Sequence, residues 1–114
     1  MKIFGKWQII EMELWEQEDV ELMGPTYIEF GSNKEGQFNF IAVEGCMNCH
    51  HTIKDGQPFV DFTWDGNDKC DAVNGRGWAT ILKGVLCGRI YFHQGDNSEF
   101  KAIRTDTKMK WTKK

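Results

Sequence analysis

Short runs of apolar and aromatic residues recur along the chain, and clusters of glycine, asparagine, aspartate or proline separate them about every ten residues. Within most runs apolar and polar positions alternate, which is the period of a half-buried β-strand rather than of a helix. One helical turn is predicted at residues 16–24, before Pro25 restarts an extended chain. The pattern predicts eight strands, at residues 6–15, 27–30, 37–43, 48–54, 58–64, 76–82, 85–93 and 99–104.

Two stretches of this pattern predict irregular structure. Residues 65–75 are a long polar segment that predicts a loop, and Glu44 with Gly45 predicts the turn that ends the third strand. An open sheet of short strands would expose two edges, and closure into a barrel removes them. We therefore expect an all-β protein, a single small antiparallel meander barrel of about eight strands with one short helical turn after the first. The interior of such a barrel is just wide enough for packed side chains or one small ligand.

A meander places its successive turns alternately at the two ends of a barrel. The connections after the first, third, fifth and seventh strands therefore share one end, which we call the mouth. We expect the mouth to gather the acidic helical insert, residues 45–51, the loop 65–75 and the turn 95–98. This arrangement depends on the fourth strand, because one missing strand would move every later connection to the opposite end.

Composition and charge support one acidic domain. The chain has 114 residues, the usual size of a single domain, and its eight Phe, five Trp and two Tyr favour strands. Residues 1–106 form the predicted barrel domain, whose ten basic and seventeen acidic side chains give a charge of −7 and disfavour nucleic-acid binding. Residues 107–114 are a basic tail with four lysines, either a contact for an anionic partner or a solvated chain end.

The expected compartment follows from what the chain lacks. The N-terminal residues contain no continuous apolar segment of a signal peptide, and no stretch approaches the ~20 apolar residues of a membrane helix. We therefore expect a cytoplasmic protein without a membrane partner. In that compartment the four cysteines are expected to be thiols or ligands rather than disulfides.

Two points at the ends of the chain carry a resemblance to a known group of barrels. Gly5, Lys6 and Trp7 open the first predicted strand, and Arg104 lies on the last. The pattern resembles the short signature of the calycins, which include lipocalins, fatty-acid-binding proteins and avidin-like barrels. In those families the Trp closes one end of the barrel and a basic residue of the final strand packs across it. The resemblance implies a lipocalin-like build, and the short chain implies a small cavity.

A second resemblance rests on three internal segments, residues 66–68, 75–79 and 88–93, which read Gly-Asn-Asp, Gly-Arg-Gly-Trp-Ala and Gly-Arg-Ile-Tyr-Phe-His. With them the chain resembles a family of short uncharacterised bacterial proteins. The resemblance implies a bacterial, cytosolic origin and no particular activity.

The motif Cys-x-x-Cys-His-His at residues 46–51 has three chemical interpretations. Haem attachment takes place outside the cytosol, and a redox dithiol usually needs a following helix, so both are disfavoured. Zinc is the best of the three, with Cys46, Cys49, Cys70 and either His50 or His51 as ligands and the metal in a structural role. The alternative is that the thiols fill small gaps and no cofactor is bound. The oxygen-rich residues 65–71 are expected to cap turns rather than to bind calcium.

Polar residues within strands are the other candidates. In the seventh strand apolar residues such as Leu86 and Ile90 share one face, and polar residues such as Arg89 and Tyr91 share the other. If the apolar face is inward, the polar set forms a solvated outer surface. If the interior is instead a polar cavity, it would hold a small charged ligand through paired hydrogen bonds. The ligand-binding residues of that second case are Asp61, Arg76, Trp78, Arg89, Tyr91 and His93.

The sequence contains no nucleophile elbow, no nucleotide-binding loop and no other complete catalytic motif, so an enzyme is not the first expectation. We expect a non-catalytic barrel that binds a small polar ligand or a protein partner at its mouth. The first alternative is a protein-interaction module with a packed interior, which contacts its partner through the outer sheet face and the basic tail. The second alternative is a barrel stabilised by structural zinc.

Overall fold

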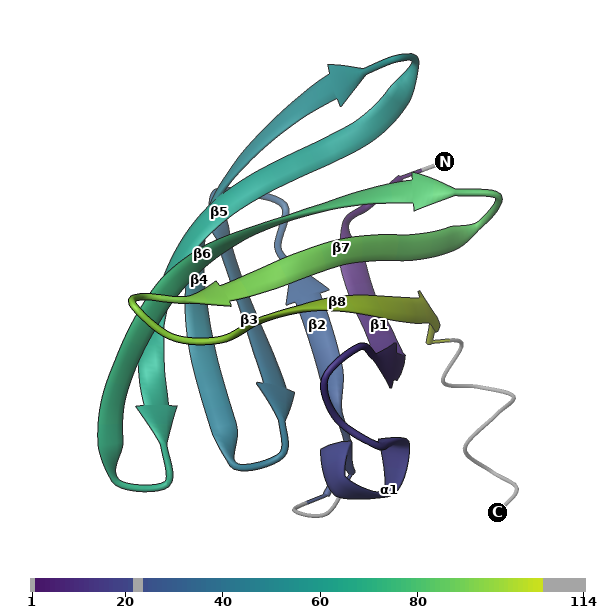
Figure 1. Cartoon of the computed structure of the whole chain (residues 1–114). Helices are drawn as coiled ribbons and strands as arrows, with labels where there is room; N and C mark the ends of the chain where they lie inside the picture. Colours follow the sequence, from purple (N-terminus) through teal and green to yellow (C-terminus); the bar gives the residue numbers. More distant parts are fainter. Residues whose placement is uncertain (1, 22–23, 106–114) are drawn as a thin grey trace.

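The described residues form a closed antiparallel barrel of eight strands, β1 to β8, with one short helix, α1, after the first strand (Figure 1). The computed structural model describes residues 2–21 and 24–105, so the predicted basic tail lies outside the described residues. Each strand pairs with the next, and β1 pairs with β8 to close the barrel. The predicted fold class is confirmed. The elements are β1 (Gly5–Met12), α1 (Gln17–Val20), β2 (Tyr27–Phe30), β3 (Glu35–Phe40), β4 (Val43–Lys54), β5 (Gln57–Asp68), β6 (Asp71–Leu82), β7 (Val85–Phe92) and β8 (Asn97–Arg104).

Two predicted irregular regions are strands instead. β4 begins at Val43, so residues 44–51 lie within a strand and the turn before them is at residues 41–42. β5 and β6 together span most of the predicted loop 65–75, and a two-residue turn at Lys69 and Cys70 joins them. Lys69 has a φ of 61°, as such a tight turn requires. The prediction of a long polar loop was therefore wrong, and glycines inside strands caused the error.

Gly45 and Gly75, like Gly77 and Gly88, lie directly opposite aromatic residues whose side chains point into the barrel. A Cβ atom added to Gly45 would overlap the ring of Phe38, and one added to Gly77 would lie 2.5 Å from Cζ of Phe62. The missing side chain leaves the space that the facing ring occupies, so glycine and ring fill the interior together. The cross-strand pairs of this kind are Phe38 with Gly45, Phe62 with Gly77, Trp64 with Gly75, and Phe100 with Gly88.

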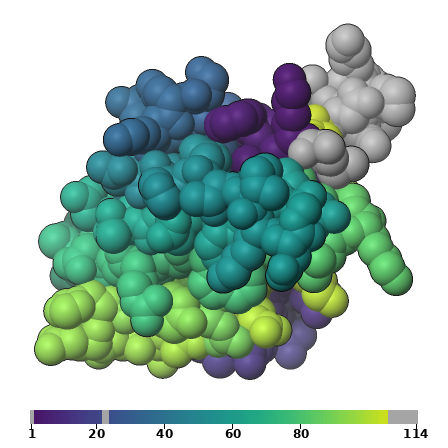
Figure 2. All heavy atoms as spheres, turned by 90° about the horizontal axis from the view of Figure 1, so that it is seen from above, coloured from purple at the N-terminus to yellow at the C-terminus, as the bar shows by residue number. Residues whose placement is uncertain are grey.

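Apolar side chains fill the interior along its length. The inward positions of all eight strands form one hydrophobic cluster with residues from the N-terminal segment and α1. Figure 2 views the molecule from the side of the β4–β5 hairpin and shows a continuous surface of atoms there. The large side chains with less than 2% exposure include Trp7, Phe30, Phe38, Phe40, Phe100, Ile9, Ile28, Ile81, Leu86 and Ile90. The centre of the barrel is therefore a packed core, which limits a ligand site to its ends or its outer face.

Trp7 and Arg104 close the end of the barrel at which β1 begins. Trp7 is fully buried and its indole Nε1 donates a hydrogen bond to the carbonyl oxygen of Ile3 at 2.9 Å. The guanidinium carbon of Arg104 lies 4.0 Å from the centroid of the Trp7 ring. Its Nη1 donates to the carbonyl oxygen of Phe4 at 2.6 Å, and its Nη2 donates to that of Lys2. We call this the closed end, and its geometry matches what the calycin resemblance implies for these two residues.

The opposite end is the mouth. The connections after β1, β3, β5 and β7 meet there, and they occupy the lower and left sides of Figure 1. Their described residues are 13–21, 24–26, 41–42, 69–70 and 93–96. The fully buried side chain of Val20 anchors α1, and the backbone N–H of Ile41 donates to the carbonyl oxygen of Val20 at 2.8 Å. The helix is thereby fixed to the β3–β4 turn at the edge of the mouth.

Candidate functional site

The mouth contains a depression of about 620 Å³, within the usual size range of small-molecule sites. Its lining comes from the connections that the meander brings together and from the adjoining ends of the strands. The apolar part of the lining consists of Trp15, Phe40, Ile41, Val43, Val73 and Phe92. The polar part consists of Asp68, Asn74, His93 and Asp96, with Ala72 and Gly95 completing the rim.

Aromatic rings form one continuous wall of the depression. The ring centroids of Trp15 and Phe40 lie 5.7 Å apart, and those of Phe40 and Phe92 lie 6.3 Å apart. Phe92 in turn packs edge-to-face on Trp64 at 5.2 Å, which joins the wall to the core. Phe40 and Trp64 are buried, whereas Trp15 and Phe92 are half-buried. The half-buried rings of Trp15 and Phe92 therefore present surface to the depression, and the buried rings of Phe40 and Trp64 support them.

Backbone hydrogen bonds hold the polar rim in place. The N–H of His93 donates to the carbonyl oxygen of Asn74 at 2.7 Å, which joins the β7–β8 turn to β6. The N–H of Lys69 donates to the carbonyl oxygen of Ala42 at 3.1 Å, which joins the β5–β6 and β3–β4 turns. Strand alternation places Asp68 on the same inward face as Trp64. These two hydrogen bonds thus fix the turns next to the rim, one against β6 and the other against its neighbouring turn.

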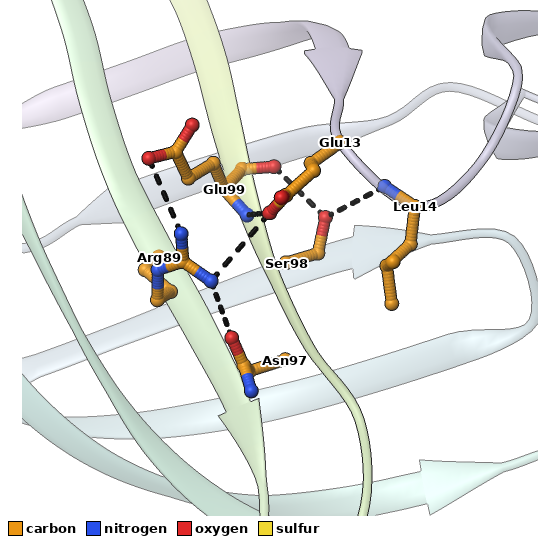
Figure 3. Close-up of polar contacts among 6 residues, drawn as sticks. All are labelled: Glu13, Leu14, Arg89, Asn97, Ser98 and Glu99. Carbon is orange, nitrogen blue, oxygen red and sulfur yellow. Dashed lines mark hydrogen bonds and ion pairs between the residues drawn. The ribbon is translucent and has the colours of Figure 1, made fainter.

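A polar network on the outside of the barrel holds the segment that carries Trp15 (Figure 3). Arg89 on β7 forms ion pairs with Glu13 at 3.5 Å and with Glu99 at 3.2 Å, and donates a hydrogen bond to Asn97. The N–H of Glu99 donates to the carboxylate of Glu13 at 3.1 Å. The buried hydroxyl of Ser98 accepts a hydrogen bond from the N–H of Leu14 at 3.2 Å. These contacts fix residues 13–14 against β7 and β8, immediately before Trp15.

The predicted ligand-binding residues lie mainly outside the barrel. Leu86 and Ile90 are buried, so the apolar face of β7 is inward and the polar face is outward. Of the six predicted residues only His93 lines the mouth depression. The prediction of a polar interior lined by these side chains is therefore wrong. The other five are Asp61, Arg76, Trp78, Arg89 and Tyr91, which lie on the outer face of β5, β6 and β7.

Those five residues contact one another and their neighbours on the outer face. The guanidinium carbon of Arg76 lies 4.1 Å from the centroid of Tyr91. Trp78 stacks on Phe59 with centroids 6.0 Å apart and ring planes at 14°. Asp61 pairs with Nδ1 of His50 at 3.2 Å. These are surface contacts across neighbouring strands, of the kind that stabilises a sheet.

The structure does not bring the four predicted zinc ligands together. Cys46 and His50 point outward from β4, Cys49 points inward with 2% exposure, and Cys70 lies in the β5–β6 turn. Residues three apart on a strand face opposite sides of the sheet, which is why the Cys-x-x-Cys spacing fails here. No group of three or more His, Cys, Asp or Glu side chains in the described ranges is arranged to hold a metal ion. Burial, with a smaller contribution from the charge of Asp61, raises the pKa of the Cys49 thiol to about 11, so this thiol stays protonated near neutral pH.

A second depression, of about 510 Å³, lies on the outside of β1 and β2. The ammonium of Lys6 there lies 4.4 Å from the centroid of Tyr27. Gly24, Pro25, Thr26 and Thr105 are also part of its lining.

Sequence reasoning missed most of the residues that line the mouth. Trp15 was included in the first strand, Asp68 in a turn-capping cluster, and Phe40 and Phe92 among ordinary strand residues. The signal that identifies them is position: each lies at the end of a strand, or just beyond it, next to one of the four mouth connections. Correct strand boundaries were needed to use that signal.

Two further observations concern the chain as a whole. In the described part of the chain no helix is long and apolar enough to cross a membrane. Comparison of the chain with models of known protein families found no match, and comparison with curated proteins and with solved structures found none either.

Proposed function

We propose that the protein is a non-catalytic binding barrel that takes up one small molecule in the mouth depression. The observation that carries the proposal is an aromatic wall that faces a polar rim in one concavity. Trp15, Phe40 and Phe92 supply the wall, and Asp68, His93 and Asp96 lie on the rim. Concave apolar sites with a few placed polar groups are typical of small-molecule binding.

The packed core determines how such a ligand would sit. Because Phe40, Trp64 and their neighbours fill the barrel below the depression, the ligand rests across the mouth rather than deep inside. An apolar body would stack on the aromatic wall, and a polar group would point to the rim. This refines the expectation of a small polar ligand to a molecule with one apolar and one polar part.

We also propose a calycin-like build and a bacterial, cytoplasmic origin for the protein. A calycin-like build is supported by the Trp7–Arg104 stack at the closed end and by the eight-stranded meander. A bacterial and cytoplasmic origin is supported by the resemblance of residues 66–68, 75–79 and 88–93, and by four free cysteines.

The experiment is titration with N-phenyl-1-naphthylamine, a neutral aromatic probe whose fluorescence rises in apolar surroundings. We expect saturable binding to the full chain and a rise in its unfolding temperature, since a ligand that binds only the folded state stabilises it. Val73→Arg points a long side chain into the depression, because Val73 lies on the inward face of β6 and lines it, and should abolish binding. Thr63→Arg, on the exposed outer face of β5, is the matched control and should bind as the parent does.

Equal binding by the Val73→Arg variant and the parent would show that the probe does not occupy the mouth. Unfolding midpoints of both variants must match the parent, so that loss of binding is not loss of fold. Absence of any saturable signal in the parent protein would overturn the proposal.

A second candidate function is protein interaction through the outer face of β5 to β7. The stacked rings of Trp78 and Phe59 are half-buried rather than covered, and the interior behind them is solid. Aromatic side chains with nearby arginines are enriched at protein interfaces. This alternative predicts that no small molecule shifts the unfolding temperature, and that Trp78→Ser leaves the fold intact while a co-purifying partner is lost.

A further inference from the structure

Acidic residues dominate the surroundings of the mouth. The four mouth connections contain six acidic residues and one basic residue. Asp68 and Asp71, at the strand ends on either side of the β5–β6 turn, add two more carboxylates. Because charges of one sign around a concavity reinforce one another, the depression lies in a negative potential.

The lining itself has the same sign. Asp68 and Asp96 contribute carboxylates, and among the described lining residues His93 is the single side chain that can become positive. Lys69 lies in the adjoining turn but is exposed and does not line the depression. An anionic ligand would therefore meet two carboxylates without a compensating lysine or arginine.

The aromatic wall adds a second preference for positive charge. The faces of aromatic rings carry negative charge density and attract a cation placed over them, with tryptophan the strongest. Trp15, Phe40 and Phe92 all line the same concavity as the two carboxylates. A cation beside these rings and within reach of the rim would be favoured by both, whereas a neutral molecule gains only the apolar contact.

We infer that the ligand class of the mouth is an organic cation with an apolar body, such as an aromatic amine or a quaternary ammonium compound. This inference rests on the proposed function and names the chemistry of its ligand. Asp68 and Asp96 select the charge, and the Trp15–Phe40–Phe92 wall holds the apolar body.

The test compares three probes with the same naphthalene body and different charge. They are 2-naphthylmethylamine, which is cationic at pH 7, 2-naphthylmethanol, which is neutral, and 2-naphthoate, which is anionic. Dissociation constants are measured by isothermal titration calorimetry with the full chain. We expect the amine to bind about tenfold more tightly than the alcohol, and the alcohol more tightly than the carboxylate.

Substitution of the rim separates charge from shape. In the double variant Asp68→Asn/Asp96→Asn the preference for the amine over the alcohol should fall below about threefold, while the alcohol binds as before. Asp61→Asn, which removes a carboxylate from the outer face, is the matched control and should keep the full preference. The unfolding midpoint of each variant verifies that it is folded.

The outcomes distinguish the inference from the function on which it rests. Equal affinity for amine and alcohol overturns the cation inference and leaves the proposed binding function standing. Retention of the full preference in the double variant also overturns it, because the two carboxylates would then not select the charge. No binding by any of the three probes, together with no binding of N-phenyl-1-naphthylamine, overturns both.

Discussion

The two ends of the barrel use aromatic and charged residues in opposite ways. At the closed end Trp7 is fully buried, and Arg104 stacks on it while donating hydrogen bonds to two backbone carbonyl oxygens. At the mouth Trp15 is half-buried, and it faces a concavity together with the carboxylates of Asp68 and Asp96. The hydrogen-bonding groups of Trp7 and Arg104 are used within the fold, whereas the carboxylates of Asp68 and Asp96 line an open depression.

Charge separates the two ends as well. The three turns at the closed end and residues 2–4 contain Lys2, Lys34 and Lys83 against one acid, Asp55. The mouth connections carry six acids against one lysine. A tryptophan with an adjacent charged side chain therefore does not define a binding site by itself. At the closed end the rest of the fold already supplies the hydrogen-bond partners of both side chains.

The largest expected effect comes from removing the tryptophan of each end in turn. Trp7→Ala should lower the free energy of unfolding by about 3–5 kcal/mol, because it leaves a cavity beneath Arg104. Trp15→Ala should cost roughly 1 kcal/mol, because its side chain is only partly buried and lines the depression. Urea unfolding followed by circular dichroism measures both. Equal losses would contradict the distinction between a structural and a binding tryptophan.

A smaller effect is expected from the ring–glycine pairs that fill the barrel between its ends. Gly45→Ala should cost about 2 kcal/mol, because the added methyl group overlaps the Phe38 ring. In a Phe38→Leu background the same change should cost clearly less, since the ring is gone. Gly75→Ala is the contrasting case, because its methyl group would overlap the backbone oxygen of Tyr91 and no side-chain change can relieve that. Identical costs of Gly45→Ala in both backgrounds would refute the pairing.

The closed end also contains a polar group that the fold leaves unsatisfied, and it predicts a pH dependence. His51 packs against Phe4 with ring centroids 4.7 Å apart, and within the described chain neither of its ring nitrogens has a hydrogen-bond partner. Burial, and to a lesser extent the charge of His50, lowers the pKa of His51 below its ordinary value. The unfolded chain therefore binds a proton more readily than the folded protein.

The stability contributed by neutral His51 is fully present above the ordinary histidine pKa of about 6.5 and is lost as the pH falls below it, toward the lowered pKa of the folded state. For one proton the slope cannot exceed about 1.4 kcal/mol per pH unit. Unfolding midpoints between pH 5 and pH 8, compared with those of His51→Phe, measure this contribution. His50→Gln is the control and should retain most of the dependence. A His51→Phe variant with an unchanged profile would assign the titration to another group.

The smallest expected effect concerns the ion pairs that hold the Trp15 segment. Glu13→Gln should lower the free energy of unfolding by less than about 1 kcal/mol, because the carboxylate is partly exposed. Its effect on the mouth should be more distinct, since the contacts to Arg89 and to the N–H of Glu99 fix the chain just before Trp15. We expect weaker binding of N-phenyl-1-naphthylamine by Glu13→Gln, whereas Glu11→Gln, near the end of β1, should bind normally. Unchanged affinity in Glu13→Gln would show that the network does not position the wall.

Much of the architecture was predictable because it depends on local periodicity. Alternating apolar positions identified eight strands and one helical turn, and the edge argument then favoured a barrel. The boundaries failed at Gly45, Gly66 and Gly75, where a residue typical of turns lies inside a strand. The sequence does not distinguish a strand glycine that faces an aromatic ring from a glycine in a turn, because the difference depends on which residue of the partner strand lies opposite.

The position of the candidate site at the mouth was predictable, but most of the residues that line it were not. The meander rule located it at the mouth, and His93 was named, but the wall of Trp15, Phe40 and Phe92 was not. Side-chain direction explains why the Cys-x-x-Cys motif and the outer-face residues were misleading. Cys46 and Cys49 are neighbours in the sequence and lie on opposite sides of β4.

The sequence by itself determined the class of fold, the number of strands and the opposition of the two ends, because alternation and chain connectivity are local properties. The tertiary structure decided which face of each strand is inward, which glycines receive a ring, and which residues from the four connections line one concavity. Those features depend on contacts between strands far apart in the chain. The mouth depression exists only once β1 and β8 have closed the barrel and brought the four connections together.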